Sequence, residues 1–268
     1  MVTKLFLIDL KRCIFNIRFI ITLIIGIAIC YYGLTDYFSY NPKDFDIPNL
    51  INAYMACFTA MGIGNKSFFV LIAAIIAVLP SSYLLLQDRQ SGYLKNILTR
   101  TTYVRYFRCR LVTNAISGGL AVMIPPIITF IVCSCLYPNA NPNTPPNTWG
   151  FLPHGLWSDI YATHPFRYIL LNLTIIFIFG ITYSTIGLTV SLFVHKRISV
   201  ILIPLIVYTL GNIALELFEI LMFSPNQTLF PWLSARSNFL SIYGELLLII
   251  VLCLFICKIH IEKGSVYL

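Results

Sequence analysis

Charged residues are scarce in this chain of 268 residues: they make up 10% of it, whereas hydrophobic residues make up 58%. Soluble domains carry about 25% charged residues, so this chain has too few of them to cover a surface that faces water. That shortage excludes an ordinary soluble domain. Apolar runs of about 20 residues, the length needed to cross a bilayer, recur along the chain. The composition therefore predicts an all-α polytopic membrane protein with a single transmembrane domain over residues 1–268.

The chain also lacks the motifs of an energy-consuming enzyme. No Walker A pattern is present, since "GIGNKS" at Gly62–Ser67 has Gly, Lys and Ser in the wrong order. The middles of the apolar runs carry no ionisable residue, which disfavours an ion relay through the membrane. We therefore expect no catalytic, cofactor-binding or metal-binding residue in this chain.

Eight cysteines are present, but most lie in or beside apolar runs, where they are expected to act as small packing residues. The first apolar run is longer than the core of a signal peptide and is preceded by cations spread over 18 residues. It is interpreted as a retained first span.

Six spans are predicted from the apolar runs. Proline occurs in the second and third of them, where it is expected to mark kinks. The approximate bounds are Phe19–Tyr37, Ser67–Leu86, Leu111–Tyr137, Tyr168–Val194, Ile198–Met222 and Phe239–Cys257.

The distribution of cations predicts the orientation. The first 18 residues, the 87–110 segment, the turn at 195–197 and the C-terminal residues together hold fourteen of the eighteen Lys and Arg residues. By the positive-inside rule these segments are cytoplasmic. Both termini are then cytoplasmic, and the net charge of +8 needs no nucleic-acid partner to explain it.

Three connections are expected on the outer side. The first contains "NLINAYMACFTAMG", which we expect to form a short helix at the membrane interface. The second, about 138–167, is rich in Pro and Asn and is expected to be an irregular cap. The third joins spans five and six over about 213–238.

The segment from Gln87 to Arg110 carries six cations and one acid between two apolar runs. Gly92 allows the chain to turn from span two along the membrane surface. The residues Tyr93, Leu94, Ile97 and Leu98 follow helical spacing and form one apolar stripe. Such a stripe can bind a groove on a soluble partner. The alternative is a basic loop held near anionic lipid headgroups, and the two interpretations are compatible.

This segment resembles the permease subunits of the type-two family of ATP-binding-cassette transporters. The matching positions are Gln90, Ser91, Gly92, Leu94, Ile97, Leu98, Thr99 and Arg100, and the resemblance assigns all of them except Thr99 to coupling with an ATPase. Tyr106 and Arg110 fit the entry to span three. Asp88 and Gln90 stand where a more acidic run is usual, and Thr101-Thr102 replaces a commoner Pro step.

The resemblance implies several further features. Residues 1–17 would form an interfacial helix, 87–110 a cytoplasmic coupling loop, and 213–238 an outer re-entrant hairpin. A separate ABC ATPase subunit would bind ATP and Mg, and a second permease would complete a homo- or heterodimer in the cell membrane.

The predicted function is that of a permease in an ATP-driven exporter. The aromatic content and the lack of buried charge favour an apolar or amphipathic cargo: a peptide, lipid or drug, including a peptide toxin exported for immunity. The acids and cation expected near an outer gate or substrate path are Glu216, Glu219, Arg236 and Glu245.

Three other classes of protein stay open. An ATP-independent secondary transporter or channel would use those same outer residues as ligands. A membrane enzyme would use His154, Asp159 and His164 of the second outer loop. A structural membrane scaffold is the third.

Overall fold

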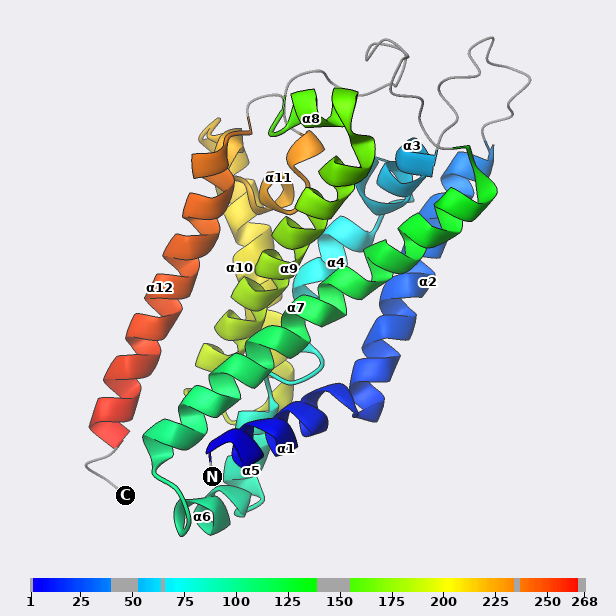
Figure 1. Ribbon diagram of the computed structural model, residues 1–268. Helices are drawn as coiled ribbons and strands as arrows, with labels where there is room; N and C mark the ends of the chain where they lie inside the picture. The colour runs from blue at the N-terminus through cyan, green and yellow to red at the C-terminus, as the bar shows by residue number, and fades with distance from the viewer. Residues whose placement is uncertain (1, 40–52, 64–65, 139–154, 234–236, 265–268) are drawn as a thin grey trace.

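The computed structural model describes residues 2–39, 53–63, 66–138, 155–233 and 237–264, and these are helical with no strand. Five helices are long and apolar enough to cross a membrane, which indicates a multi-pass membrane protein. They lie side by side as a bundle (Figure 1). They are α2 (Ile17–Ser39), α7 (Tyr103–Leu136), α9 (Pro165–Val190), α10 (Arg197–Leu217) and α12 (Phe239–Gly264).

The second expected span is not one continuous helix. It is divided into α4 (Phe69–Val78) and α5 (Leu84–Gln90), with a turn over residues 79–83 between them. Pro80 lies in this turn, where its missing N–H and its ring interrupt the helical hydrogen bonds. In contrast, Pro125 and Pro126 lie within the unbroken α7.

Asn114 of α7 holds the turn between α4 and α5. Its side-chain oxygen accepts hydrogen bonds from the hydroxyls of Ser81 at 2.8 Å and Ser82 at 3.1 Å. Its amide nitrogen donates to the backbone oxygen of Ser184 in α9 at 2.8 Å. All four residues are buried, so this contact replaces water as the partner of polar groups inside an apolar bundle.

Small residues let α7 and α9 pack closely near this turn. A Cβ atom added to Gly180 of α9 would lie 2.7 Å from the backbone oxygen of Gly118 in α7. Close approach of backbones at small residues is the usual way in which membrane helices associate. These two helices form the centre of the bundle, and α12 packs against α9 from outside it (Figure 1).

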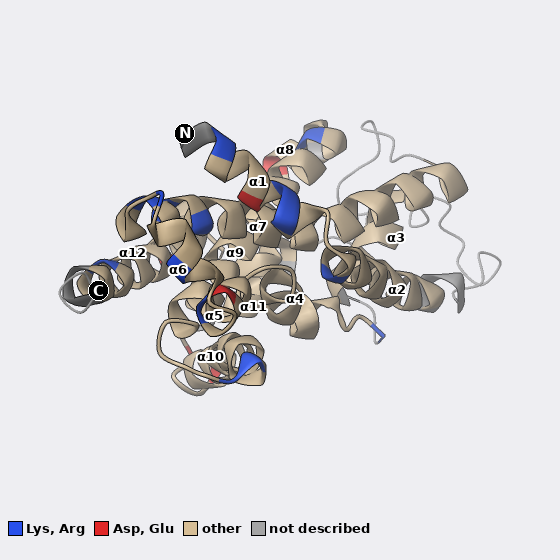
Figure 2. Ribbon diagram, turned by 90° about the horizontal axis from the view of Figure 1, so that it is seen from below, with Lys and Arg blue, Asp and Glu red and all other residues tan. Residues whose placement is uncertain are grey.

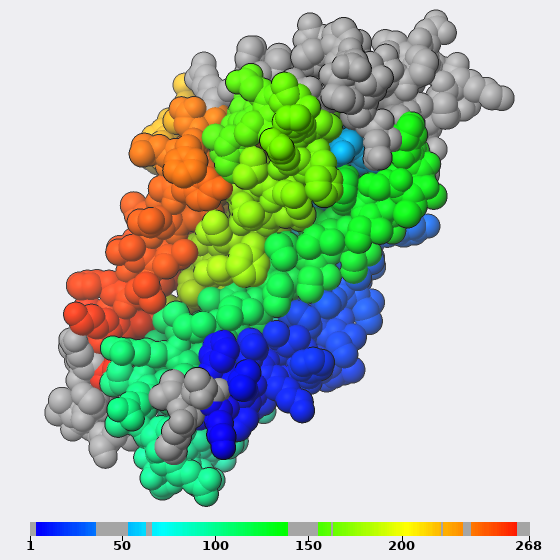
Figure 3. All heavy atoms as spheres, viewed as in Figure 1, coloured from blue at the N-terminus to red at the C-terminus, as the bar shows by residue number. Residues whose placement is uncertain are grey.

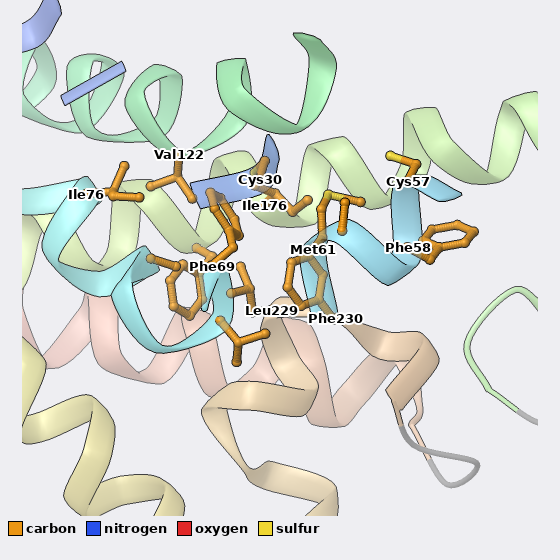
Figure 4. Packing of buried hydrophobic residues seen from close by; sticks show 14 of the residues in the cluster. Cys30, Cys57, Phe58, Met61, Phe69, Ile76, Val122, Ile176, Leu229 and Phe230 are labelled. Carbon is orange, nitrogen blue, oxygen red and sulfur yellow. The ribbon is translucent and has the colours of Figure 1, made fainter. Parts of the chain in front are cut away.

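Several short helices fill the end of the bundle that is opposite α1 and α6. Figure 4 shows side chains from α4, α7 and α9 meeting Leu229 and Phe230 of the connection between α10 and α12. The short elements are α3 (Ala53–Phe58), the π-helix η2 (Thr59–Ile63), α8 (Ser158–Thr163), η4 (Leu221–Phe223), α11 (Pro225–Leu229) and η5 (Pro231–Leu233).

Two of the sequence expectations concern this end of the bundle. The short helix expected in the first connection is present as α3, and it is buried within the protein: Ala53, Ala56 and Phe58 have no exposed surface. The described part of the second connection, from residue 155 onward, contains α8 and the buried Tyr161. The reason in both cases is aromatic packing, in which Phe58 contacts Tyr161 and Trp232.

We expect Asn114→Leu to destabilise the protein, because Ser81, Ser82 and the oxygen of Ser184 would lose their buried partner. The expected loss is about 2 kcal/mol, read as a lower thermal unfolding temperature in detergent. Thr174→Ala is the matched control, since Thr174 is exposed and its hydroxyl donates to the backbone oxygen of Leu171 one turn earlier. Equal unfolding temperatures for the two variants would contradict this role of Asn114.

Candidate functional site at the basic end of the bundle

The end of the bundle that carries most of the described cations is built from α1 (Val2–Ile14), α5 and α6 (Tyr93–Leu98). The start of α10 and the end of α12 lie at this same end (Figure 1). Seen from below, Lys and Arg gather over these elements (Figure 2). We call it the basic end. The helix α1 lies against α7 there, as the space-filling view also shows (Figure 3).

The chain turns sharply between α5 and α6, as the sequence predicts. Gly92 has a φ of +74°, a conformation that favours glycine. Just before it, Gln90 donates a hydrogen bond from Nε2 to the backbone oxygen of His195 at 2.8 Å, and Arg89 donates to that of Leu192 at 3.0 Å. The end of α5 is therefore tied to the turn between α9 and α10.

Part of the apolar stripe of α6 packs against the protein itself, whereas Tyr93 is exposed. Leu94 and Ile97 pack against a buried cluster that includes Tyr106 and Phe107 of α7. Arg12 of α1 lies 4.6 Å from the centre of the Tyr93 ring. Periodicity locates a stripe on a helix but does not say whether the protein's own helices or a partner cover it.

The outward face of α6 is consequently polar. Lys95, Asn96 and Thr99 are exposed, as are Ser91 before the helix and Arg100 after it, while Leu98 is half-buried. The loop is also shorter than expected, because α7 begins at Tyr103 rather than near Leu111. Helix α6 is thus a short, cationic projection supported from behind by its own apolar residues.

Behind α6 lies a group of charged side chains that we call the charge cluster: Asp9 and Arg12 of α1, Asp88 of α5, and Arg110 of α7. Arg110 is completely buried and its Nη1 lies 2.5 Å from Asp9 Oδ1. Its Nη2 lies 3.8 Å from Asp88 Oδ2. The guanidinium therefore joins the carboxylates of two different helices.

Further contacts complete the charge cluster. Arg12 Nη2 donates to Asp88 Oδ1 at 2.8 Å, and the Tyr106 hydroxyl donates to Asp88 Oδ2 at 2.6 Å. The Thr113 hydroxyl donates to Asp9 Oδ2 at 2.7 Å. Each buried carboxylate thus has an arginine and a hydroxyl as partners, which is what a charge removed from water requires.

Two residues of α1 at the charge cluster have shifted pKa values. Burial lowers the pKa of Arg12, but the hydrogen bond and charge of Asp88 outweigh that effect and leave the pKa above its usual value. Burial raises the pKa of the Cys13 thiol to about 11. Arg12 therefore stays cationic, and Cys13 stays a neutral thiol.

The sequence interpretation missed the role of Asp9, and it placed Asp88 and Arg110 only within a basic loop. The available signal was their rarity: Asp9 and Asp88 are lone acids in strongly basic segments. Pairing them with one particular arginine required the helices α1, α5 and α7 to be placed in space.

The acids expected near an outer gate are not gathered into one site. Glu245 is half-buried in α12 and accepts a hydrogen bond from Thr228 of α11. Glu216 and Glu219 are exposed at the end of α10 and form no ion pair with a described residue. Arg236 lies outside the described residues.

The hydrogen bond of Glu245 belongs to a polar contact that holds the connection between α10 and α12. Asn212 Oδ1 accepts from the Ser224 hydroxyl at 2.7 Å and from the Asn226 backbone N–H at 2.9 Å. The hydroxyl of Tyr208 donates to the backbone oxygen of Val70 at 2.7 Å. Through its hydrogen bond with Thr228, Glu245 connects α12 to α11.

Of the three residues of the enzyme alternative, the two that the structure describes do not face each other in a pocket. Asp159 and His164 are exposed at opposite ends of α8, and His154 lies outside the described residues. Among the described residues, no three His, Cys, Asp or Glu side chains are grouped so that they could hold a metal ion.

Comparisons of this chain with models of known protein families, with curated proteins and with solved structures find no match.

We expect Arg110→Met to be strongly destabilising, because it leaves Asp9 buried without its countercharge. The expected loss is about 3 kcal/mol, measured as the drop in thermal unfolding temperature in detergent. Arg108→Met is the control, since Arg108 lies on the same helix but is exposed. Adding Asp9→Asn to Arg110→Met should restore part of the loss, and a purely additive double variant would contradict the pairing.

We expect Cys13 to resist N-ethylmaleimide at pH 8, whereas the exposed Cys135 reacts. The low reactivity of Cys13 follows from its raised pKa. With a pKa of about 11 instead of 9.0, only about one thiol in a thousand is ionised at that pH. Peptide mass spectrometry measures the labelling. Asp9→Ala should release α1 and increase labelling of Cys13 alone. Equal labelling of both cysteines in the unaltered protein would contradict this burial.

Proposed function

We propose that this protein is the transmembrane permease subunit of an ATP-driven exporter of the type-two ATP-binding-cassette family, acting in the cell membrane. ATP and Mg would be bound by a separate ATPase subunit. The observation that carries the proposal is the projecting helix α6, which follows a glycine turn at the basic end and is linked to the rest of the bundle by the charge cluster.

In this proposal α6 is the coupling helix that receives the motion of the ATPase. A displacement of α6 would pass into α7 through its packing against Tyr106 and Phe107. It would also pass into α1 and α7 through the contacts of Asp88 with Arg12 and Arg110. The hydrogen bonds of Arg89 and Gln90 would carry it to the turn between α9 and α10. Rigid-body movement of packed helices is a common way to switch the side from which a cavity is open.

The proposed topology has six crossings with both termini in the cytoplasm. The five long helices supply five crossings, and α4 with α5 supplies the sixth as a broken span. The placement of α1 and of the C-terminal end of α12 at the same end of the bundle favours an even number (Figure 1). The positive-inside rule favours a cytoplasmic basic end.

A second permease, identical or related, would complete the transport path. The helices α2, α10 and α12 support this because they expose apolar side chains on much of their surface, including Ile24, Ile206 and Leu248. The cargo in this proposal is apolar or amphipathic: a peptide, lipid or drug.

Co-purification tests the proposal. The detergent-solubilised chain should bring down a Walker-type ATPase from its native membrane. Reversing two charges of the α6 segment, as Lys95→Glu with Arg100→Glu, should reduce recovery of the ATPase about tenfold or more, because it places repulsive groups in the interface.

The matched control is Arg105→Glu with Arg108→Glu, which reverses two exposed charges on α7. It should recover the ATPase at the level of the unaltered chain. Absence of an ATPase from the unaltered sample, or equal recovery with both double variants, would overturn the coupling role of α6.

A further inference from the structure

A groove of about 320 Å³ opens between α2 and α10 near the basic end. Both helices pack against α4, one on each side (Figure 2), so the turn that follows α4 lies between them. The apolar lining consists of Ile21 and Ile25 of α2, Leu79 and Tyr83 of the broken span, and Ile201 of α10. Ile21 is 48% and Ile25 39% exposed, so the groove continues into an outward-facing apolar surface.

Two arginines line the same groove. Arg18 is the second residue of α2 and Arg197 is the first residue of α10, so both stand at the basic end of the groove. Neither forms an ion pair with a described carboxylate, and because both line one groove their like charges repel. This is the opposite of the charge cluster, where each arginine has a carboxylate. A bound anion would stabilise two like positive charges beside an apolar surface.

The contacts of Arg18 and the hydroxyl of Tyr83 favour binding of such an anion in the groove. The Arg18 guanidinium lies 4.5 Å from the centre of the Tyr83 ring, and its Nη1 donates to Gln87 Oε1 at 3.4 Å. These contacts hold one cation in place without neutralising it. The hydroxyl of Tyr83 is buried and has no hydrogen-bond partner among the described residues. It is a further donor for an oxygen-rich group.

We propose that this groove binds an anionic phospholipid, with its phosphate between Arg18 and Arg197 and an acyl chain along Ile21, Ile25 and Ile201. Basic pockets between membrane helices bind acidic headgroups in this way. The apolar lining distinguishes the ligand from free phosphate, and a choline headgroup would bring a third cation to two that already repel. The site belongs to this chain alone and does not depend on the proposed transport function.

Native mass spectrometry of the detergent-solubilised chain tests the proposal without any ATPase. Phosphatidylglycerol and phosphatidylcholine with the same acyl chains are titrated separately. One phosphatidylglycerol should bind in preference to phosphatidylcholine. Arg18→Gln with Arg197→Gln should weaken that binding about tenfold or more, since each cation near a headgroup contributes about 1 kcal/mol.

Two further variants separate the groove from general basicity. Arg105→Gln with Arg108→Gln removes two exposed charges elsewhere at the basic end and should leave binding unchanged. Ile21→Trp fills the apolar part of the groove while keeping both arginines, and should weaken phosphatidylglycerol binding. Thermal unfolding temperatures close to that of the unaltered chain show that the variants are folded.

Several results would overturn the proposal. Equal binding of the two lipids, or equal loss in both double variants, would show a non-specific surface attraction. Full displacement of the lipid by millimolar inorganic phosphate, with Ile21→Trp unaffected, would show a site for a small anion. Recovery or loss of an ATPase in the co-purification experiment bears on the transport function only, so the two proposals can fail separately.

Discussion

The buried guanidinium of Arg110 is the interaction on which the basic end depends. It has no contact with water and lies against the carboxylate of Asp9, with that of Asp88 next to it. A buried charge is tolerated only when it is paired and hydrogen-bonded, so Arg110 dictates where α1 and α5 lie relative to α7. Helix α6 follows α5 after one turn at Gly92, and its position therefore depends on the same contact. The positions of the N-terminal helix, the broken span and the projecting helix are thus connected through the contacts of Arg110.

Two buried asparagines supply hydrogen-bond partners to polar groups where helices are interrupted, at two places in the bundle. Asn114 satisfies the serines of the turn between α4 and α5, and Asn212 satisfies the start of α11. In a chain with an apolar surface, an interrupted helix is stable only where neighbouring helices supply hydrogen-bond partners. The interruptions are therefore held rigidly, and the first of them forms part of the groove between α2 and α10.

The basic end combines two kinds of arginine with different consequences. Arg12 and Arg110 are paired with carboxylates and connect helices, whereas Arg18 and Arg197 have no described carboxylate and line an apolar groove. In the proposed function, the first kind would transmit movement from α6 into the bundle. The second kind provides a place where an acidic headgroup would relieve repulsion. The cations that sequence analysis treats as one class thus divide by their partners into a structural group and a binding group.

The sequence by itself determined the membrane character, the approximate position of five long helices, the turn at Gly92 and the concentration of cations in a few segments. These follow from composition and from local backbone preferences. Only the tertiary structure decided that the second span is broken, that α3 is buried, that the stripe of α6 packs in part against α7, and that Asp9 pairs with Arg110. The physical reason is that membrane helices are apolar both where they face lipid and where they face each other. Periodicity in such a chain does not distinguish inside from outside, and several partners of its few polar residues lie more than a hundred positions away.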